Sequence, residues 1–217
     1  MARKVDEYPT AAAYLPSRLT IPAMREASKG CHGCPLYKLG TQTVFGEGKS
    51  TARIVMVGEQ PGDQEDRAGK PFVGPAGKLL DEALEEVGID RDDVYVTNAV
   101  KHFKWEPRGT RRLHSKPSAR EVQACKPWLT SELAVIKPEM VVCLGATAAQ
   151  ALMGKEFRIT RSRGEVFRET GYALWVMATV HPSSILRTPS EDREAAYRAF
   201  VHDLQIAAEE LGVRQPK

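Results

Sequence analysis

The stretch RGTRRLHSKPS, residues 108–118, concentrates side chains that can bind anions or react. It holds three arginines, a lysine and His114 between residues that favour loops. Residues 101–120 contain seven Lys or Arg and one acid, a local charge of +6, whereas the whole chain carries only +3. Such clustered charge is typical of a surface that binds phosphates. By composition alone, the stretch is therefore a basic loop and a phosphate contact.

A second group with chemical potential is CHGC, which gives Cys31 and Cys34 the C-x-x-C spacing. The spacing fits a zinc half-site, a redox pair or chance. A thioredoxin-like motif follows a strand and opens a helix, and nothing strand-like precedes Cys31. Cys143 lies in an apolar run, where a free cysteine behaves as a small hydrophobe. A metal needs two further ligands, and the candidates are the disfavoured Cys143 together with Cys125, His32, His102, His114, His181 and His202.

Four apolar, β-branched runs predict strands that are buried on both faces. They are RIVMVG (53–58), DVYVTNAV (93–100), EMVVCLG (139–145) and LWVMATV (174–180). Helical patterns lie between and after them, at 76–88, 118–138, 146–154 and 190–212, and the second opens with the capping-box spacing of Ser118 and Glu121. The alternation predicts a three-layer α/β/α fold with a central, mainly parallel four-stranded sheet.

Polar side chains follow three of these predicted strands. Glu59 lies in GEQPG, Asn98 in TNAVKHF and His181 in HPSS, while the remaining strand leads into GATAA. Each segment alone has a structural explanation as a turn or a helix cap. In open α/β sheets, however, ligands bind beyond the carboxyl ends of the strands. The convergence of these groups at one sheet edge therefore predicts a binding site.

Composition limits the class of protein. A chain of 217 residues with 42% hydrophobic and 27% charged residues suits one globular α/β domain. We expect an N-terminal extension over residues 1–27 and a single domain over 28–217, with the basic loop inserted at 106–117. No apolar run approaches the roughly 20 residues that span a bilayer, and we identify no signal peptide. We therefore expect a cytoplasmic monomer without a membrane partner, whose cysteines are not disulfide-bonded.

The motifs GEQPG, GKPFVGPAGKLLD, VTNAVKHF, LGATAA and HPSS, in this order, resemble the uracil-DNA glycosylase superfamily, close to its iron–sulfur family 4. The similarity covers roughly residues 28–212. The RGTRRLH loop and the histidine of VKHF resemble UdgX, a branch of that family that becomes covalently attached to uracil-containing DNA. One residue departs from the branch pattern, because Thr110 stands where the branch has a lysine before the two arginines. The loop's packing or its affinity for DNA is therefore open to change.

The resemblance implies a 4Fe–4S cluster. Its ligands would be Cys31, Cys34, His102 and Cys125, with His102 at a position where relatives have cysteine. Cysteine thiolates usually hold such clusters, and histidine replaces them in some centres. The alternative is that His102 is only a polar residue at a strand end. The cluster is expected to order the N-terminal segment and the loop near DNA.

The resemblance also assigns a uracil pocket. A glycosylase extrudes its base, holds it and stabilises charge as the N-glycosidic bond breaks. Phe72 would stack on uracil, the Asn98 amide would read its edge, and His181 would donate a hydrogen bond to the uracil oxygen as negative charge develops. Taken alone, Phe72 is equally an ordinary core aromatic and Asn98 a turn residue. The pocket wall would be completed by backbone groups of Gln60 and Gly62 and by Asp63.

Two further groups would act at the sugar. Glu59 would stabilise an oxocarbenium-like centre or orient a water molecule. In the UdgX-like interpretation, His114 instead attacks C1′, with Glu59 preparing the imidazole, and free uracil stays in the pocket. Arg111 and Arg112 would favour the neutral imidazole through like-charge repulsion, hold the loop or bind phosphates. The residues assigned to DNA contacts or to the shape of the loop are Arg111, Arg112, Ser183 and Ser184.

Three functional hypotheses follow. The first is a protein that excises uracil from DNA, preferably single-stranded, and becomes covalently linked to the abasic sugar through His114. The alternative is a family 4-type glycosylase with normal turnover, in which the basic loop only binds DNA and His114 contacts a phosphate. The third is a non-catalytic binder of single-stranded nucleic acid that uses Trp105 as a stacking platform. The polar groups at three strand ends argue against the third.

Overall fold

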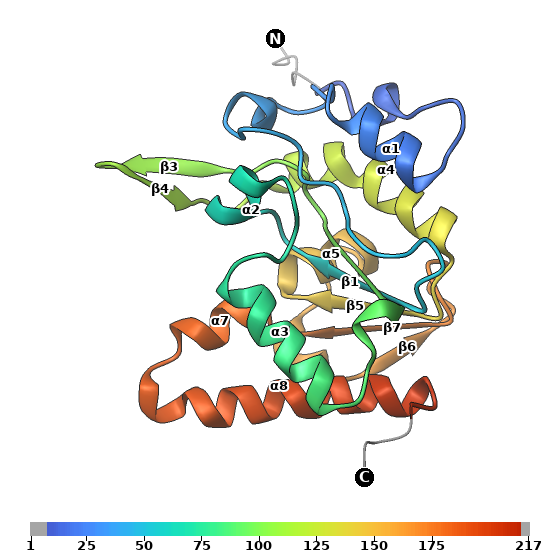
Figure 1. Ribbon diagram of the computed structural model, residues 1–217, viewed down its shortest axis with the longest axis vertical. Helices are drawn as coiled ribbons and strands as arrows, with labels where there is room; N and C mark the ends of the chain where they lie inside the picture. Colours follow the sequence, from blue (N-terminus) through green and yellow to red (C-terminus); the bar gives the residue numbers. More distant parts are fainter. Residues whose placement is uncertain (1–7, 214–217) are drawn as a thin grey trace.

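A computed structural model describes residues 8–213 as three layers, with a central sheet covered on both faces by helices (Figure 1). The sheet order is β2 (Val94–Asn98), β1 (Ile54–Gly58), β5 (Met140–Leu144), β7 (Trp175–Thr179) and β6 (Val166–Arg168). The first four strands are parallel and confirm the four predicted strands.

The prediction of a four-stranded sheet was wrong in number, because β6 adds a fifth strand antiparallel to β7. Its three residues, VFR, are too few to show an alternation of apolar and polar residues. An antiparallel edge strand on an otherwise parallel sheet is common in this class of fold.

Helices bury both faces of the sheet. One face packs against α3 (Pro75–Glu86), α7 (Pro182–Arg187) and α8 (Ser190–Glu210), and the other against α1 (Ile21–Ser28), α4 (Ala119–Ile136) and α5 (Ala146–Met153) (Figure 1). The predicted capping box at the start of α4 is present, because the Ser118 hydroxyl accepts from the Glu121 N–H and the Glu121 carboxylate accepts from the Ser118 N–H. The shorter elements are η1 (Ala11–Tyr14), η2 (Pro35–Lys38), α2 (Asp63–Ala68), η3 (Arg91–Asp93) and α6 (Ile159–Ser162).

The segment expected to be a basic loop at 106–117 is instead largely a β-hairpin. Strands β3 (Trp105–Arg108) and β4 (Arg111–His114) pair antiparallel and project from the body of the molecule (Figure 1). A two-residue turn joins them, and Gly109 takes a φ of +59° there, a conformation that glycine adopts freely. Of the two residues that suggested a loop in 108–118, Gly109 belongs to this turn, and Pro117 lies in the segment between β4 and α4.

Part of the expected N-terminal extension, residues 1–7, lies outside the described residues. From residue 8 onward this segment packs on the domain: Ala11, Ile21 and Met24 are buried in the same cluster as α4. Within residues 8–213, none of the helices has the length and apolar character needed to cross a membrane. The domain boundaries themselves stay predictions.

Candidate active site

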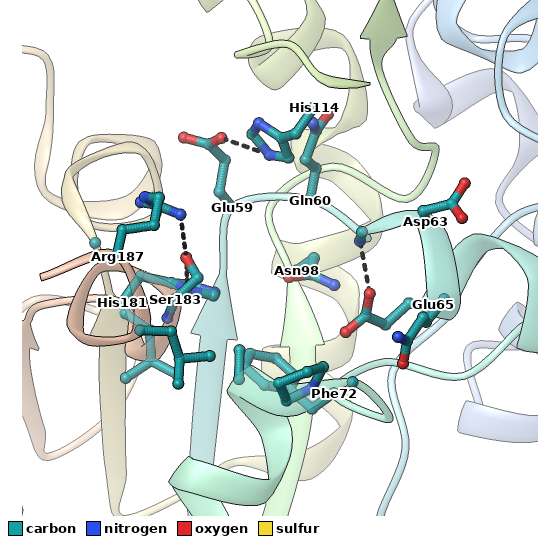
Figure 2. A pocket seen from close by; sticks show the side chains of 18 of the residues that line it. Glu59, Gln60, Asp63, Glu65, Phe72, Asn98, His114, His181, Ser183 and Arg187 are labelled. Carbon is teal, nitrogen blue, oxygen red and sulfur yellow. Dashed lines mark hydrogen bonds and ion pairs between the residues drawn. The ribbon is translucent and has the colours of Figure 1, made fainter. Parts of the chain in front are cut away.

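The carboxyl ends of the parallel strands open into a cavity of about 740 Å³ (Figure 2). Its walls come from the segments that follow β1, β2 and β5, the starts of α2 and α7, and the strand β4. The structure thus brings together groups that are as much as 128 residues apart in the sequence, as Glu59 and Arg187 are. The sequence-predicted residues that line the cavity are Glu59, Gln60, Gly62, Asp63, Phe72, Asn98, His114, His181 and Ser183.

Gly58, the last residue of β1, forms the floor on which three of these side chains converge. A Cβ at this position would lie 2.3 Å from Asn98 Oδ1, 3.0 Å from Phe72 Cζ and 3.4 Å from His181 Nε2. The amide, the phenyl ring and the imidazole therefore surround one small space that only glycine leaves open. The sequence analysis did not select Gly58, although it opens the GEQPG motif.

Phe72 is held in a conformation that non-glycine residues rarely adopt. Its φ is +56°, and its ring stacks at an interplanar angle of 26° and a centroid distance of 5.9 Å against His181. Gly77 of α3 fixes this backbone, because a Cβ there would lie 1.7 Å from the Phe72 carbonyl oxygen. Such strain costs on the order of 1–3 kcal/mol and is typical of functional sites. Phe72 is therefore not an ordinary core aromatic.

His181 caps the N-terminus of α7, and this position sets its tautomer. Its Nδ1 accepts the Ser183 backbone N–H at 3.2 Å, which leaves the ring proton on Nε2, facing the cavity floor. Burial, together with the smaller effects of the charges of Arg187 and His114, lowers the pKa of His181 to about 4. The imidazole is therefore neutral at pH 7 and offers an N–H to a developing anion.

Asn98 is 3% exposed, and a buried ion pair fixes its backbone. Lys101 Nζ donates to the Asn98 carbonyl at 2.9 Å, to Thr97 Oγ1 at 2.6 Å and to Glu132 Oε2 at 2.6 Å. Both charged side chains are almost completely buried. The strand end that presents the Asn98 amide is thus anchored from inside the protein.

Glu59 and His114 face each other across the cavity mouth (Figure 2). His114 Nε2 lies 3.3 Å from Glu59 Oε1, and the other oxygen of Glu59 accepts the hydroxyl of Thr147 in α5. A nucleophile candidate beside a base that a third group orients is the arrangement expected for covalent catalysis. Thr147 was missed by the sequence analysis, although it lies in the GATAA segment that follows β5.

Gln60 holds the base of the hairpin. Its side-chain oxygen accepts the Lys104 N–H at 3.1 Å, and its amide nitrogen donates to the carbonyls of Lys104 and Ser115 at 3.2 and 3.0 Å. The sequence analysis assigned only the backbone of Gln60 to the pocket wall. The side chain instead bridges the entry and the exit of the β3–β4 segment.

Arg112 is a second anchor of the hairpin. It forms ion pairs with Asp63 at 2.5 Å and with the buried Asp66 at 2.7 Å, and its guanidinium lies over the ring of Trp105. The expectation that Arg112 acts on His114 by repulsion is therefore not supported, because acids already compensate its charge. Trp105, whose indole N–H donates to the Leu39 carbonyl at 2.8 Å, is not a free stacking platform.

The match to known proteins agrees with this geometry. A family model described as Uracil DNA glycosylase superfamily matches residues 45–205, which include every wall of the cavity. The chain belongs to this superfamily.

Three relatives of this chain carry the name type-4 uracil-DNA glycosylase. That of Thermotoga maritima is 43% identical over 84% of this chain and 90% of its own, and that of Archaeoglobus fulgidus 39% identical over 86% and 90%. That of Pyrobaculum aerophilum is 38% identical over 79% and 87%. These relatives confirm the predicted resemblance to family 4.

A solved structure gives the same fold class. The crystal structure of wild-type SMUG2 from Pedobacter heparinus matches this chain with a TM-score of 0.50 at 13% identity. The match covers 76% of this chain and 77% of the SMUG2 chain. At this identity the likeness concerns the fold alone. It agrees with the predicted α/β class.

The candidate cluster ligands are buried. Burial is the largest of the causes that raise the pKa of the Cys34 thiol to about 11 and that of the Cys125 thiol to about 12, and the neighbouring thiols contribute to both shifts in the same direction. Two sulfurs accept N–H groups at 3.3 Å, Cys125 from the Lys101 backbone and Cys31 from the Trp128 indole. Such N–H···S bonds are a feature of iron–sulfur sites.

The fourth candidate, His102, is buried next to Lys101, and burial lowers its pKa to about 4, so its ring nitrogen is available to a metal. Among residues 8–213, no three His, Cys, Asp or Glu side chains are grouped closely enough to hold one metal ion. The 4Fe–4S cluster therefore stays a prediction. Cys143 lies in β5 within the core.

Besides Arg112 and the candidate cluster ligands, two predicted site residues lie outside the cavity lining. The Ser184 hydroxyl donates to the His181 carbonyl at 2.7 Å, which makes it part of the first turn of α7, and Arg111 lies exposed on β4. Among the lining residues that were not predicted are Glu65 and Arg187. Glu65 accepts the Gly62 N–H at 2.9 Å, and Arg187 donates to Ser183 Oγ at 3.1 Å (Figure 2).

Proposed function

We propose that this protein excises uracil from DNA. The observation that carries the proposal is the convergence of Phe72, Asn98 and His181 over Gly58, which suits one planar base with hydrogen-bonding edges. The identity of 38–43% to proteins named type-4 uracil-DNA glycosylases supports it. The extruded uracil stacks on the phenyl ring, and the amide meets a carbonyl and an N–H on its edge.

The same residues account for bond cleavage. The C1′–N1 bond breaks, its electron pair leaves with uracil, and negative charge develops on the uracil oxygen. The neutral His181 donates its Nε2 proton in a hydrogen bond to that oxygen. Glu59 stabilises the positive charge at C1′ and orients the water that adds there, which gives an abasic sugar.

A second outcome at C1′ is favoured by one observation, the contact of 3.3 Å between His114 Nε2 and Glu59 Oε1. In this version a ring nitrogen of His114 bonds to C1′ as uracil leaves with the electron pair, and Glu59 accepts the proton from Nε2. The product is a His114–deoxyribose bond, as in the UdgX branch. The names of the relatives support turnover more directly than this capture.

One experiment tests excision and separates the two outcomes. Wild type, His114→Ala and the surface control His202→Ala are incubated with a labelled uracil-containing oligonucleotide and run on a denaturing gel. Capture gives a slow, heat-stable band with wild type and His202→Ala that His114→Ala lacks. Several abasic products per protein molecule without such a band would establish turnover instead. No abasic product and no adduct would overturn the glycosylase proposal.

Single-stranded DNA is the substrate that we expect to be preferred. An unpaired base loses less stacking and pairing energy on extrusion than a base in a duplex. The preference predicts faster single-turnover excision from a single strand than from the same strand in a duplex. Equal excision rates on the single strand and the duplex would contradict the expected preference. The monomeric state is checked by light scattering on the purified protein.

We also propose that Cys31, Cys34, His102 and Cys125 hold a 4Fe–4S cluster. The burial of these residues and the N–H···S bonds support the proposal. The cluster would connect the N-terminal segment to the segment that follows β2. Anaerobically purified protein should be brown and contain iron and labile sulfide. Cys125→Ala should lose the colour while the core variant Cys143→Ala keeps it. Colourless, iron-free wild type with intact folding would overturn the assignment.

A further inference from the structure

The two faces of the β3–β4 hairpin carry different chemistry. Side chains alternate between the faces of a strand, and the cross-strand pairs are Trp105 with His114, Glu106 with Leu113, Pro107 with Arg112 and Arg108 with Arg111. The inner face, defined by Trp105, Arg112 and His114, contacts the body of the protein. The outer face, defined by Arg108, Arg111 and Leu113, is exposed.

The basic residues around the hairpin divide in the same way. Three of the seven are compensated, because Lys101 pairs with Glu132, Lys104 with Glu121 at 3.0 Å, and Arg112 with Asp63 and Asp66. The positive charge available for a ligand is therefore smaller than the local +6 of the sequence. The four exposed ones that remain are Arg108, Arg111, Lys116 and Arg120.

Arg108 and Arg111 lie directly opposite each other on the two strands. Like charges in this position destabilise a hairpin. In the part of the chain from residue 8 to residue 213, neither arginine has an ion-pair partner, and the nearby Glu106 accepts the Ser115 hydroxyl at 3.0 Å instead. Two opposed, exposed guanidinium groups without an ion-pair partner can bind an external anion, and repeated phosphates are the anions that DNA supplies.

Leu113 adds an apolar group to this face. It is 40% exposed and also lines the mouth of the cavity, next to His114. A single exposed leucine is ordinary on a protein surface. This one lies where a strand must pass when its base enters the cavity, and extrusion leaves a gap between the neighbouring bases. Leucine is among the apolar side chains that proteins insert between base steps.

We infer that the outer face is a docking surface for the DNA strand that carries the target base. Arg108 and Arg111 hold phosphates beside the extruded nucleotide, and Leu113 packs against the base stack at the gap. The inference rests on the proposed function for the role of Leu113, whereas phosphate binding by the two arginines does not require excision. It also separates the arginines of the hairpin: Arg112 fixes its position and Arg111 contacts the ligand.

The arginines are tested with a thymine-containing single strand, which measures DNA binding without excision. Arg108→Gln/Arg111→Gln should bind about tenfold more weakly at low salt, and its plot of log affinity against log salt should be shallower by about 1.4, at about 0.7 per phosphate contact. The matched control, Lys155→Gln/Arg161→Gln, removes the same charge from exposed positions outside the hairpin and the cavity. It should behave as wild type.

Equal affinity and slope for the hairpin variant and wild type would overturn the inference, and so would an equal loss in the control, since the effect would then be one of net charge. Hydrogen exchange across β3 and β4 shows whether the hairpin variant keeps its fold; wild-type protection with weaker binding supports the inference. Since thymine DNA is used, this result stands even if uracil excision fails.

Leu113 is tested by single-turnover excision from duplex and from single-stranded DNA. Leu113→Ala should excise uracil more slowly, by about tenfold on the duplex and less on the single strand, where no paired stack has to be held open. Leu113→Met should restore the rate. An equal loss on both substrates, or no loss, would overturn the role of Leu113.

Discussion

The cavity has two walls that are built differently. The sheet wall consists of residues at the ends of parallel strands, such as Asn98 and His181, which are held by the strand ladder, the core and a helix cap. The hairpin wall consists of Leu113 and His114 on a two-stranded ribbon that projects from the domain (Figure 1). Such a ribbon is at best marginally stable by itself, and here Gln60 and Arg112 attach it.

This difference assigns different tasks to the two histidines of the cavity. Charge stabilisation needs a donor whose position and protonation do not change, and His181 has a fixed tautomer and a lowered pKa. Attack on a sugar needs a group that reaches its target, and His114 lies on the hairpin wall with half of its side chain exposed. Under the proposed function, the sheet wall would carry uracil excision and the hairpin wall would decide what happens to the sugar.

The largest effect should come from the sheet wall. His181→Ala removes the N–H aimed at the uracil oxygen, and loss of one such donor typically lowers the rate by about 10²–10³-fold. Single-turnover excision from a uracil oligonucleotide measures it, with His202→Ala as a surface control. A loss below threefold would place the charge stabilisation elsewhere in the cavity.

The floor of the sheet wall should be the next most sensitive position. Gly58→Ala places a methyl group 2.3 Å from Asn98 Oδ1, so the amide must move. Overpacking of this kind costs about 1–3 kcal/mol, which corresponds to roughly 5- to 160-fold weaker uracil binding. Free uracil as a competitive inhibitor reports this loss. Gly30→Ala is the matched control, since a Cβ there meets nothing closer than 3.9 Å; similar inhibition constants for the two variants would contradict the geometry.

Much of the sheet wall was predictable from the sequence. Apolar runs gave the four parallel strands, and polar residues just after them gave Glu59, Asn98 and His181, because side chains that follow parallel strands meet at one edge. The anchors of the hairpin wall were not predictable. The ion-pair partners of Arg112 lie 46 and 49 residues away in α2. Glu132, the ion-pair partner of Lys101, lies 31 residues away in α4. A local count of charges therefore overestimated the basic surface.

The hairpin wall can be loosened separately. Arg112→Met removes both ion pairs and leaves Asp66 buried, although Thr41 still donates to it. We expect about 1–3 kcal/mol less protection from hydrogen exchange in β3 and β4, with little change in the sheet. Adduct formation, if present, should fall more than excision. Arg111→Gln should leave the exchange unchanged, and uniform destabilisation of the whole domain by Arg112→Met would contradict the two-wall description.

The smallest effect concerns pH and again separates the walls. Because the pKa of His181 is about 4 in the folded protein, the Nε2 donor persists as pH falls through the ordinary histidine range near 6.5. Between these two values the unfolded chain binds a proton at His181 that the folded chain does not, so this residue lowers stability as pH falls from about 6.5 to about 4 and adds nothing further below that. Thermal unfolding of His181→Gln should therefore decline less than that of wild type over this window and run parallel to it above pH 7. If the stability of wild type and of His181→Gln changed in parallel over the whole pH range, the pKa of His181 in the folded protein would be that of an ordinary surface histidine.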